Sequence, residues 1–165
     1  MIKCTTLCYI ERDGKYLMLH RVKKENDINH DKWIGIGGHC EAGESPEDCI
    51  RREAMEETGY ELRSLSFRGI ITFIYGDDVT EYMMLFTSDN ISGREKVCDE
   101  GDLVWVDKSE VPKLNLWPGD RIFLKLLESG EPFFSLKLVY DKNDTLTETA
   151  LNGEALDTDN MIFTF

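Results

Sequence analysis

Residues 38–60 read GHCEAGESPEDCIRREAMEETGY, and the organisation of the chain is decided in this stretch. Ser45 is suited to the N-cap of a helix, Pro46 to its first position, and Asp48 stands three residues after the cap. Gly59 is suited to the residue that ends a helix in the left-handed conformation. The sequence therefore predicts a helix between Ser45 and Gly59.

Three glutamates crowd one side of this helix. Glu53 is followed at spacings of three and four by Glu56 and Glu57, so the three carboxylates are neighbours. Like charges at such spacings destabilise a helix by roughly 0.2–0.5 kcal/mol each. Two explanations are open: a solvated face whose acids pair with Arg51 and Arg52, or oxygen ligands that converge on a divalent cation such as Mg²⁺ or Mn²⁺.

The spacing of the fixed residues resembles the signature of the Nudix hydrolase family, Gly-x5-Glu-x7-Arg-Glu-U-x-Glu-Glu-x-Gly-U, where U is a bulky apolar residue. The matching residues are Gly38, Glu44, Arg52, Glu53, Glu56, Glu57 and Gly59, with Ala54 and Tyr60 at the U positions. Seven fixed residues coincide by chance about once in 10⁸ starts. The resemblance therefore favours the metal-ligand explanation.

The resemblance implies a loop–helix–loop that presents glutamates to metal ions bridging a diphosphate. The implied ligands are Glu53, Glu56, Glu57, Glu100 in the segment DEGDLVWV, and the carbonyl of Gly37. Glu44 and Arg52 match the pair that orients the helix and its ligands. Glu53 is the favoured general base, with Glu56, Glu57 and Glu100 as alternatives.

A wider resemblance, over roughly residues 1–150, is to MutT-like 8-oxo-dGTP diphosphatases. It is carried by TTLCYIERDGKYLMLHR, KWIGIGGH, LWPGDRIF and PFFSLKLVY. It implies that Trp117 stacks on a purine and that Asp120 accepts hydrogen bonds from its polar edge. Further substrate contacts are implied for Thr6, Arg21, Gly38 and His39. The expected reaction is Mg²⁺-dependent cleavage of 8-oxo-dGTP, or a similar oxidised purine nucleotide, to the monophosphate and pyrophosphate.

Three residues depart from the pattern of the relatives, of which the Asn at the position of Ile34 is that of the vertebrate proteins. Ile34 stands where an Asn contacts the purine, Gly119 replaces a second Asp, and His39 stands where a Lys commonly follows the glycine pair. These departures leave open a Nudix hydrolase for another X-linked diphosphate, such as ADP-ribose, a dinucleoside polyphosphate or a pyrimidine nucleotide. A regulatory Nudix domain that binds nucleotides without cleaving them is a third possibility, although no glutamate of the signature is missing.

The 165 residues are consistent with one domain, over 1–153, followed by a tail at 154–165 to which the sequence gives no role. Hairpins are expected from segments 2–11 with 15–22, 67–75 with 81–88, and within 133–151; a short strand is expected at 103–106, a helical turn at 109–113 and a second helix at 119–128. The mixture predicts a mixed α/β or α+β protein. The resemblance implies the Nudix fold, an α/β/α sandwich around a mixed sheet.

Composition limits the partners. With 32 acidic and 19 basic residues the formal charge is −13, which opposes binding of nucleic acid polymers and anionic membranes and requires cations to mediate contact with a phosphorylated substrate. No apolar run is long enough to span a membrane, and the N-terminus does not read as a signal peptide. Five cysteines without CxxC pairing indicate a reducing cytoplasm and no zinc site. The oligomeric state is left open between monomer and homodimer.

Overall fold

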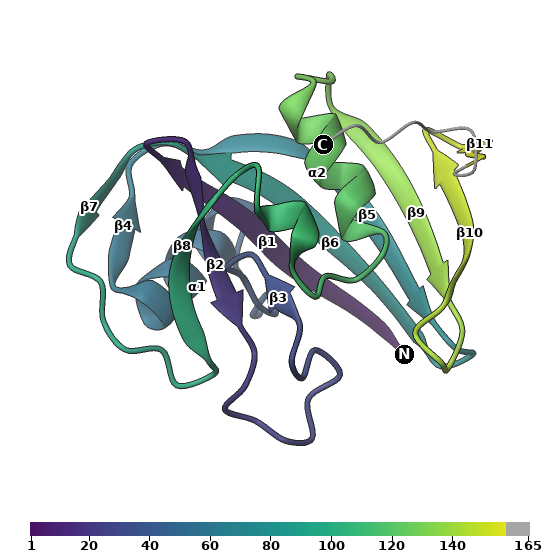
Figure 1. The fold of residues 1–165 in the computed structure, drawn as a ribbon, viewed down its shortest axis with the longest axis horizontal. Coiled ribbons are helices and arrows are strands. Elements are labelled where there is room, and N and C mark those ends of the chain that lie inside the picture. Colours follow the sequence, from purple (N-terminus) through teal and green to yellow (C-terminus); the bar gives the residue numbers. More distant parts are fainter. Residues whose placement is uncertain (158–165) are drawn as a thin grey trace.

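The computed structural model describes residues 1–157, and its first two strands form the predicted hairpin (Figure 1). β1 (Ile2–Arg12) and β2 (Lys15–His20) pair antiparallel across a two-residue turn. Asp13 and Gly14 at the turn have φ values of 53° and 76°. Positive φ at both central positions is what a tight hairpin with the right-handed twist requires, and Asp-Gly tolerates it.

Most strands belong to one mixed sheet. They are β3 (Trp33–Ile34), β5 (Ser66–Tyr75), β6 (Val79–Ser88), β8 (Asp102–Asp107), β9 (Phe134–Tyr140), β10 (Leu146–Leu151) and β11 (Glu154–Ala155), together with β1 and β2. The strand order is β11-β10-β9-β5-β6-β1-β2-β3, and β8 pairs with β2. The predicted hairpins β5–β6 and β9–β10 are confirmed, whereas the pairs β1–β6 and β5–β9 are parallel.

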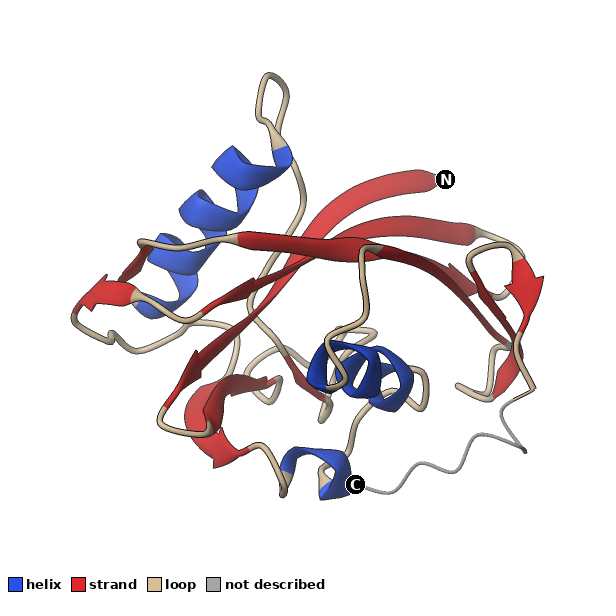
Figure 2. Cartoon of the chain, turned by 90° about the horizontal axis from the view of Figure 1, so that it is seen from above, coloured by secondary structure: helices blue, strands red, loops and turns tan. Residues whose placement is uncertain are grey.

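Helices cover both faces of this sheet, as Figure 2 shows. α1 (Pro46–Thr58) lies on one side, and α2 (Asp120–Glu128) with the short 3₁₀ helix η1 (Val111–Lys113) lies on the other. Along β1, Leu7 and Tyr9 join the core beneath α2, while Cys8 and Ile10 join the core beneath α1. The mixed fold and the α/β/α sandwich expected from the sequence are thereby confirmed.

A second, two-stranded sheet was not expected from the sequence. β4 (Tyr60–Leu62) follows α1 directly and pairs antiparallel with β7 (Ile91–Gly93). At the other end of the chain, the segment 154–165 received no predicted structure. Its residues 154–155 form β11 against β10, and residues 158–165 lie outside the described part. Within residues 1–157, no helix has the length and apolar character needed to cross a membrane.

Candidate active site

The glutamate-bearing helix begins and ends where the sequence predicts. At its start, the Asp48 N–H donates to Ser45 Oγ and the Ser45 N–H donates to the Asp48 carboxylate, each at 3.0 Å. At its end, Gly59 has φ 81° and donates its N–H to the Met55 carbonyl at 3.0 Å. A Cβ on Gly59 would lie 2.3 Å from the Arg94 carbonyl oxygen, so glycine is required for space as well as for φ.

The glycine pair lies between β1 and α1. The Thr6 N–H donates to the Gly38 carbonyl at 2.9 Å, which holds the loop against β1. A Cβ on Gly37 would lie 1.8 Å from the Thr6 carbonyl oxygen, and one on Gly38 would lie 2.4 Å from Cδ of Glu53. Side chains at these two positions would push the loop away from the helix. The glycines therefore allow the loop backbone to approach Glu53.

Arg52 ties the loop to the helix. Its guanidinium donates to both oxygens of Glu44, from Nε at 2.7 Å and from Nη2 at 2.9 Å. It also donates to Glu53 Oε1 at 2.8 Å, to Glu56 Oε2 at 3.3 Å and to the His39 carbonyl at 3.0 Å. The hydrogen bonds from Arg52 lower the pKa of Glu44. The structure thus brings together the pair expected to orient the helix, while the imidazole of His39 belongs to an exposed residue.

Three carboxylates converge behind the glycine pair. Glu57 is only 6% exposed, and one of its oxygens accepts the Gly37 N–H at 3.2 Å. Burial, then Glu100 and Glu53, raise the pKa of Glu57 to about 9. Glu53, with a side chain 15% exposed, completes the cluster, whereas the Glu56 side chain is 60% exposed. Buried like charges of this kind are stable only with a proton or a cation among them.

Arg21 lies beside this cluster and is held from both sides. Its Nε donates to Asp27 at 2.6 Å and its Nη1 donates to Glu100 at 2.6 Å. Lys24 contacts the other oxygen of Glu100 at 3.2 Å. Burial opposes the charge of Arg21, but its bond to Asp27 and the carboxylates of Glu100 and Glu57 raise its pKa. Arg21 therefore offsets part of the negative charge of the acidic cluster.

The donor set suits a hard divalent cation. Within residues 1–157 no three His, Cys, Asp or Glu side chains are already arranged as a metal cage. Carboxylate oxygens and a loop carbonyl are nevertheless the ligands that Mg²⁺ and Mn²⁺ prefer, and Mg²⁺ needs only one or two protein carboxylates. Burial is the largest cause of the raised pKa of Glu57, and the charges of Glu100 and Glu53 add to it, so a cation here would favour the ionised carboxylates. The residues present fit such an ion.

The predicted base-recognition residues occupy the other side of the sheet, at the start of α2. Trp117 is 3% exposed and packs edge to face against Phe73, and its indole N–H donates to Asn29 at 2.8 Å. The ammonium of Lys32 lies 5.1 Å from the centre of the Trp117 ring system. Stacking of a base on this ring therefore requires Lys32 to move.

Asp120 is buried near a hydroxyl that lacks a partner. Burial raises the pKa of Asp120 to about 8, against the opposing charges of Arg121 and Lys32. Within residues 1–157, the buried side-chain polar atom without a hydrogen-bond partner is the Tyr9 hydroxyl. Burial, followed by the nearby Asp120, raises the pKa of Tyr9. A buried carboxyl and an unsatisfied hydroxyl together mark a polar place that a ligand can fill.

Gly119 shows why a second Asp is absent. Its N–H donates to the Tyr140 hydroxyl at 2.8 Å. A Cβ at this position would lie 2.5 Å from Leu138 and 2.7 Å from the Tyr140 oxygen. The space of a side chain at 119 is therefore filled by Tyr140, a residue that sequence reasoning did not connect with this place.

Other predicted contacts lie apart from the base-recognition residues. Thr6 is 3% exposed, and its hydroxyl contacts Cys49 Sγ at 3.3 Å beneath the glycine pair. Sequence reasoning also missed Asp27, Asn29 and Lys32, the partners of Arg21 and Trp117. All three belong to a segment read only as a polar loop, and nothing local indicates which distant side chains such a loop contacts.

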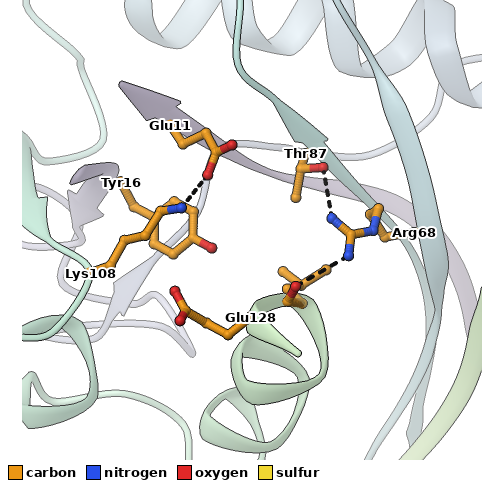
Figure 3. Close-up of a pocket in the computed structure, with 7 residues that line it drawn as sticks. Glu11, Tyr16, Arg68, Thr87, Lys108 and Glu128 are labelled. Carbon is orange, nitrogen blue, oxygen red and sulfur yellow. Dashed lines mark hydrogen bonds and ion pairs between the residues drawn. The ribbon is translucent and has the colours of Figure 1, made fainter. Parts of the chain in front are cut away.

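A cavity of about 260 Å³ opens at the hairpin end of β1 and β2, and Figure 3 shows its lining. Lys108 pairs with Glu11 there and lies 4.8 Å from the centre of the Tyr16 ring. Arg68 donates to Thr87 Oγ1 at 3.3 Å, and to a carbonyl of α2. None of the predicted site residues lines this cavity. Its charged walls join the strands to the end of α2, and it is separate from the carboxylate cluster.

Known proteins are similar to this chain over most of its length. The NUDIX domain family matches residues 3–127. An uncharacterised Nudix hydrolase of Bacillus subtilis, YvcI, is 33% identical over 131 residues, which cover 76% of this chain and 79% of the relative. An oxidized purine nucleoside triphosphate hydrolase of Danio rerio is 27% identical, covering 91% and 94%. A mutator MutT protein of Bacillus halodurans superposes with a TM-score of 0.82 at 25% identity, covering 92% and 99%.

Proposed function

This chain belongs to the Nudix family of hydrolases, and from that premise we propose that it hydrolyses oxidised purine nucleoside triphosphates, such as 8-oxo-dGTP, to the monophosphate and pyrophosphate. The observation that carries the proposal is the convergence of Glu53, Glu57 and Glu100 behind the glycine pair. The similarity to oxidized purine nucleoside triphosphate hydrolases supports the choice of substrate. The proposed setting is the free nucleotide pool of a reducing cytoplasm.

Nudix hydrolases generally use a divalent metal, and we take Mg²⁺ as the ion here, with Mn²⁺ as a substitute. Glu53, Glu57 and Glu100 would hold it together with the Gly37 carbonyl. Their support is the crowding of the buried Glu57 by the half-buried Glu53 and Glu100, which a cation would relieve. Glu56 now contacts Arg52, so its share in binding requires that contact to loosen.

The side chains of the protein position the reacting groups and accept the proton of the attacking water. Bound Mg²⁺ would neutralise phosphate oxygens and lower the pKa of an attacking water. Arg52, locked by Glu44, keeps Glu53 facing the glycine pair. From there the Glu53 carboxylate takes the proton of the water as general base, and Glu56, Glu57 and Glu100 remain the alternatives for this step.

Base recognition is assigned to the start of α2. Asp120 would accept hydrogen bonds from a purine edge and the Tyr9 hydroxyl would gain the partner it lacks, while Trp117 provides an aromatic surface once Lys32 withdraws. A buried polar set of this kind rejects a base that leaves it unpaired.

One observation favours a second candidate. Tyr140 fills the space beside Gly119, so an Asp cannot be accommodated there, and Ile34 offers no polar group in place of an Asn. The base-reading scheme of the vertebrate relatives is therefore incomplete in this chain. Another nucleotide with an X-linked diphosphate, such as ADP-ribose, is the alternative substrate.

The test is a turnover panel with Mg²⁺ in which 8-oxo-dGTP, dGTP and ADP-ribose are compared and the products are separated. We expect kcat/KM for 8-oxo-dGTP to exceed that for dGTP by about 10²-fold or more, with release of pyrophosphate. Faster turnover of ADP-ribose would establish the second candidate. Release of orthophosphate from 8-oxo-dGTP would contradict the proposed reaction. Turnover in ¹⁸O-labelled water identifies the phosphorus that is attacked.

A further inference from the structure

Three cysteines from distant parts of the chain meet beside the N-terminal end of α1. Cys4 belongs to β1, Cys40 follows the glycine pair, and Cys49 lies on the helix. The roles proposed above for the carboxylates and for Asp120 make no use of these thiols.

Cys4 and Cys40 face each other across a short antiparallel pairing. Thr5 and His39 are bridge partners, so the residues on either side of them are also opposite one another. The Cys40 N–H donates to the Cys4 carbonyl at 3.0 Å, which fixes this register. Opposed residues of a hydrogen-bonded antiparallel pair have Cα atoms about 5.5 Å apart and side chains on the same face. Disulfides typically join Cα atoms about 4.4–6.8 Å apart.

The side chains point towards α1. Thr6 shares the face of Cys4, because side chains two residues apart in a strand lie on the same side, and its hydroxyl contacts Cys49 Sγ at 3.3 Å. Burial, followed by the neighbouring thiols of Cys49 and Cys4, raises the pKa of Cys40 to about 12. Cys40 therefore has two neighbouring thiols, that of Cys4 opposite it in the pairing and that of Cys49 on the helix.

Solvent access differs among the three cysteines. Cys4 is exposed, Cys40 is half-buried and Cys49 is buried. An oxidant in solution meets Cys4 first, and the protonated thiol of Cys40 then stands next to it. This order places an accessible thiol next to a second thiol that can resolve its oxidised form.

We propose that Cys4 and Cys40 are a site of reversible oxidation that closes into a cross-strand disulfide when the protein meets a peroxide. The Cys4 thiolate attacks one peroxide oxygen, the O–O bond breaks, and the departing hydroxide takes up a proton as water. The sulfenic acid formed on Cys4 is attacked by the Cys40 sulfur; the S–S bond forms, the S–O bond breaks, and the thiol proton of Cys40 leaves with the hydroxide as a second water. Two thiols are oxidised and one peroxide is reduced to two waters.

The bond would fasten β1 to the loop that carries Gly38. That loop is held now by backbone hydrogen bonds, including the one from Thr6 to Gly38, and by Arg52 at the His39 carbonyl. A covalent link between residues so far apart in sequence restricts the unfolded chain and raises the thermal midpoint. The modification does not depend on which nucleotide is cleaved.

The test exposes the reduced full-length chain to hydrogen peroxide, alkylates the remaining thiols and identifies linked peptides by mass spectrometry. Cleavage after Glu41 and Glu44 separates Cys40 from Cys49, and tandem fragmentation separates Cys4 from the neighbouring Cys8. We expect a mass loss of about 2 Da, a fall from five free thiols to three, and a Cys4–Cys40 link. The thermal midpoint should rise by roughly 5–10 °C and return with dithiothreitol.

Matched serine variants decide the pairing. Cys4→Ser and Cys40→Ser should each abolish the peroxide-dependent rise of the thermal midpoint. Cys49→Ser is the control, because it makes the same substitution at the other neighbour of Cys40, and it should retain the rise. Any of three results would overturn the proposal: five unmodified thiols after peroxide treatment, a link between Cys40 and Cys49 instead of Cys4 and Cys40, or a disulfide between two molecules.

Discussion

Glu57 is the residue on which metal binding should depend most strongly. It is buried, and its proposed partners in the cluster are also acids. Glu57→Gln keeps an oxygen that can accept the Gly37 N–H but cannot ionise to bind a cation. We expect Mg²⁺-dependent turnover to fall by about 10²-fold or more, while the free energy of unfolding of the metal-free protein stays the same or rises. Steady-state kinetics and urea unfolding measure the two effects.

Glu61→Gln is the matched control, because it makes the same change at an exposed position of β4, immediately after the helix. It should leave turnover close to that of the unmodified protein. If Glu57→Gln turned over as fast as Glu61→Gln, Glu57 could not be a ligand.

Asp120 should make stability depend on pH. Its pKa is about 8 in the folded protein and has an ordinary value of 3.8, so the folded state holds a proton that the unfolded state loses. The stabilisation is complete below the unfolded pKa and is lost as pH rises towards the folded one, by up to about 1.4 kcal/mol for each pH unit. Between about pH 5 and pH 8, Asp120→Asn should weaken this decline. Urea unfolding over that range measures it, and equal slopes in both proteins would contradict the assignment.

Sequence reasoning at this scale succeeded where the partners are close in the chain. The cap at Ser45 and the left-handed Gly59 follow from signals at the two ends of one helix. It failed where the partner is distant. Neither the contact of Lys32 with Trp117 nor the occupation of the Gly119 side-chain space by Tyr140 has a local signature, because both depend on tertiary packing.

At the scale of elements, the stability of α1 should depend on its N-cap residue, Ser45. Ser45 and Asp48 satisfy each other's backbone N–H groups. Ser45→Ala removes one of these bonds and should lower the free energy of unfolding by about 1 kcal/mol, with fraying that weakens Mg²⁺ binding. Ser45→Thr keeps an oxygen at the cap and should cost much less. Urea unfolding, with an unchanged m-value, measures the change in stability, and calorimetric titration measures the affinity for Mg²⁺. An equal loss of stability in Ser45→Ala and Ser45→Thr would show that the hydroxyl at the cap does not stabilise the helix.

Element boundaries were predictable where a turn or cap marks them, as at Asp13-Gly14 between β1 and β2. β4 and β7 escaped prediction because each has only three residues, too few to show a period of alternation. The parallel pairing of β1 with β6 could not be read from sequence either, because hydrophobic period identifies strands but does not identify their neighbours.

At the scale of the whole molecule, a protein with a charge of −13 should respond to screening by salt as well as to specific binding of Mg²⁺, and the two effects can be measured separately. Monovalent salt screens the general repulsion among exposed acids, whereas Mg²⁺ should act at one site. At constant ionic strength, a few millimolar Mg²⁺ should raise the thermal midpoint by roughly 5–10 °C, and a chelator should reverse the rise. Glu57→Gln should lose this response and keep the response to sodium chloride. A shift of equal size in both proteins would mean that Mg²⁺ acts only as a screening ion.

The position of β1 between two cores limits how the length of the chain can vary. Leu7 and Tyr9 enter one core, and Cys8 and Ile10 enter the other. Deleting or inserting a single residue within this run would exchange the two sets on one side of the change and send those side chains to the wrong face of the sheet. In related sequences, insertions and deletions should therefore occur at the turn between Asp13 and Gly14 and not within β1. Substitutions in β1 should preserve the alternation of the two sets.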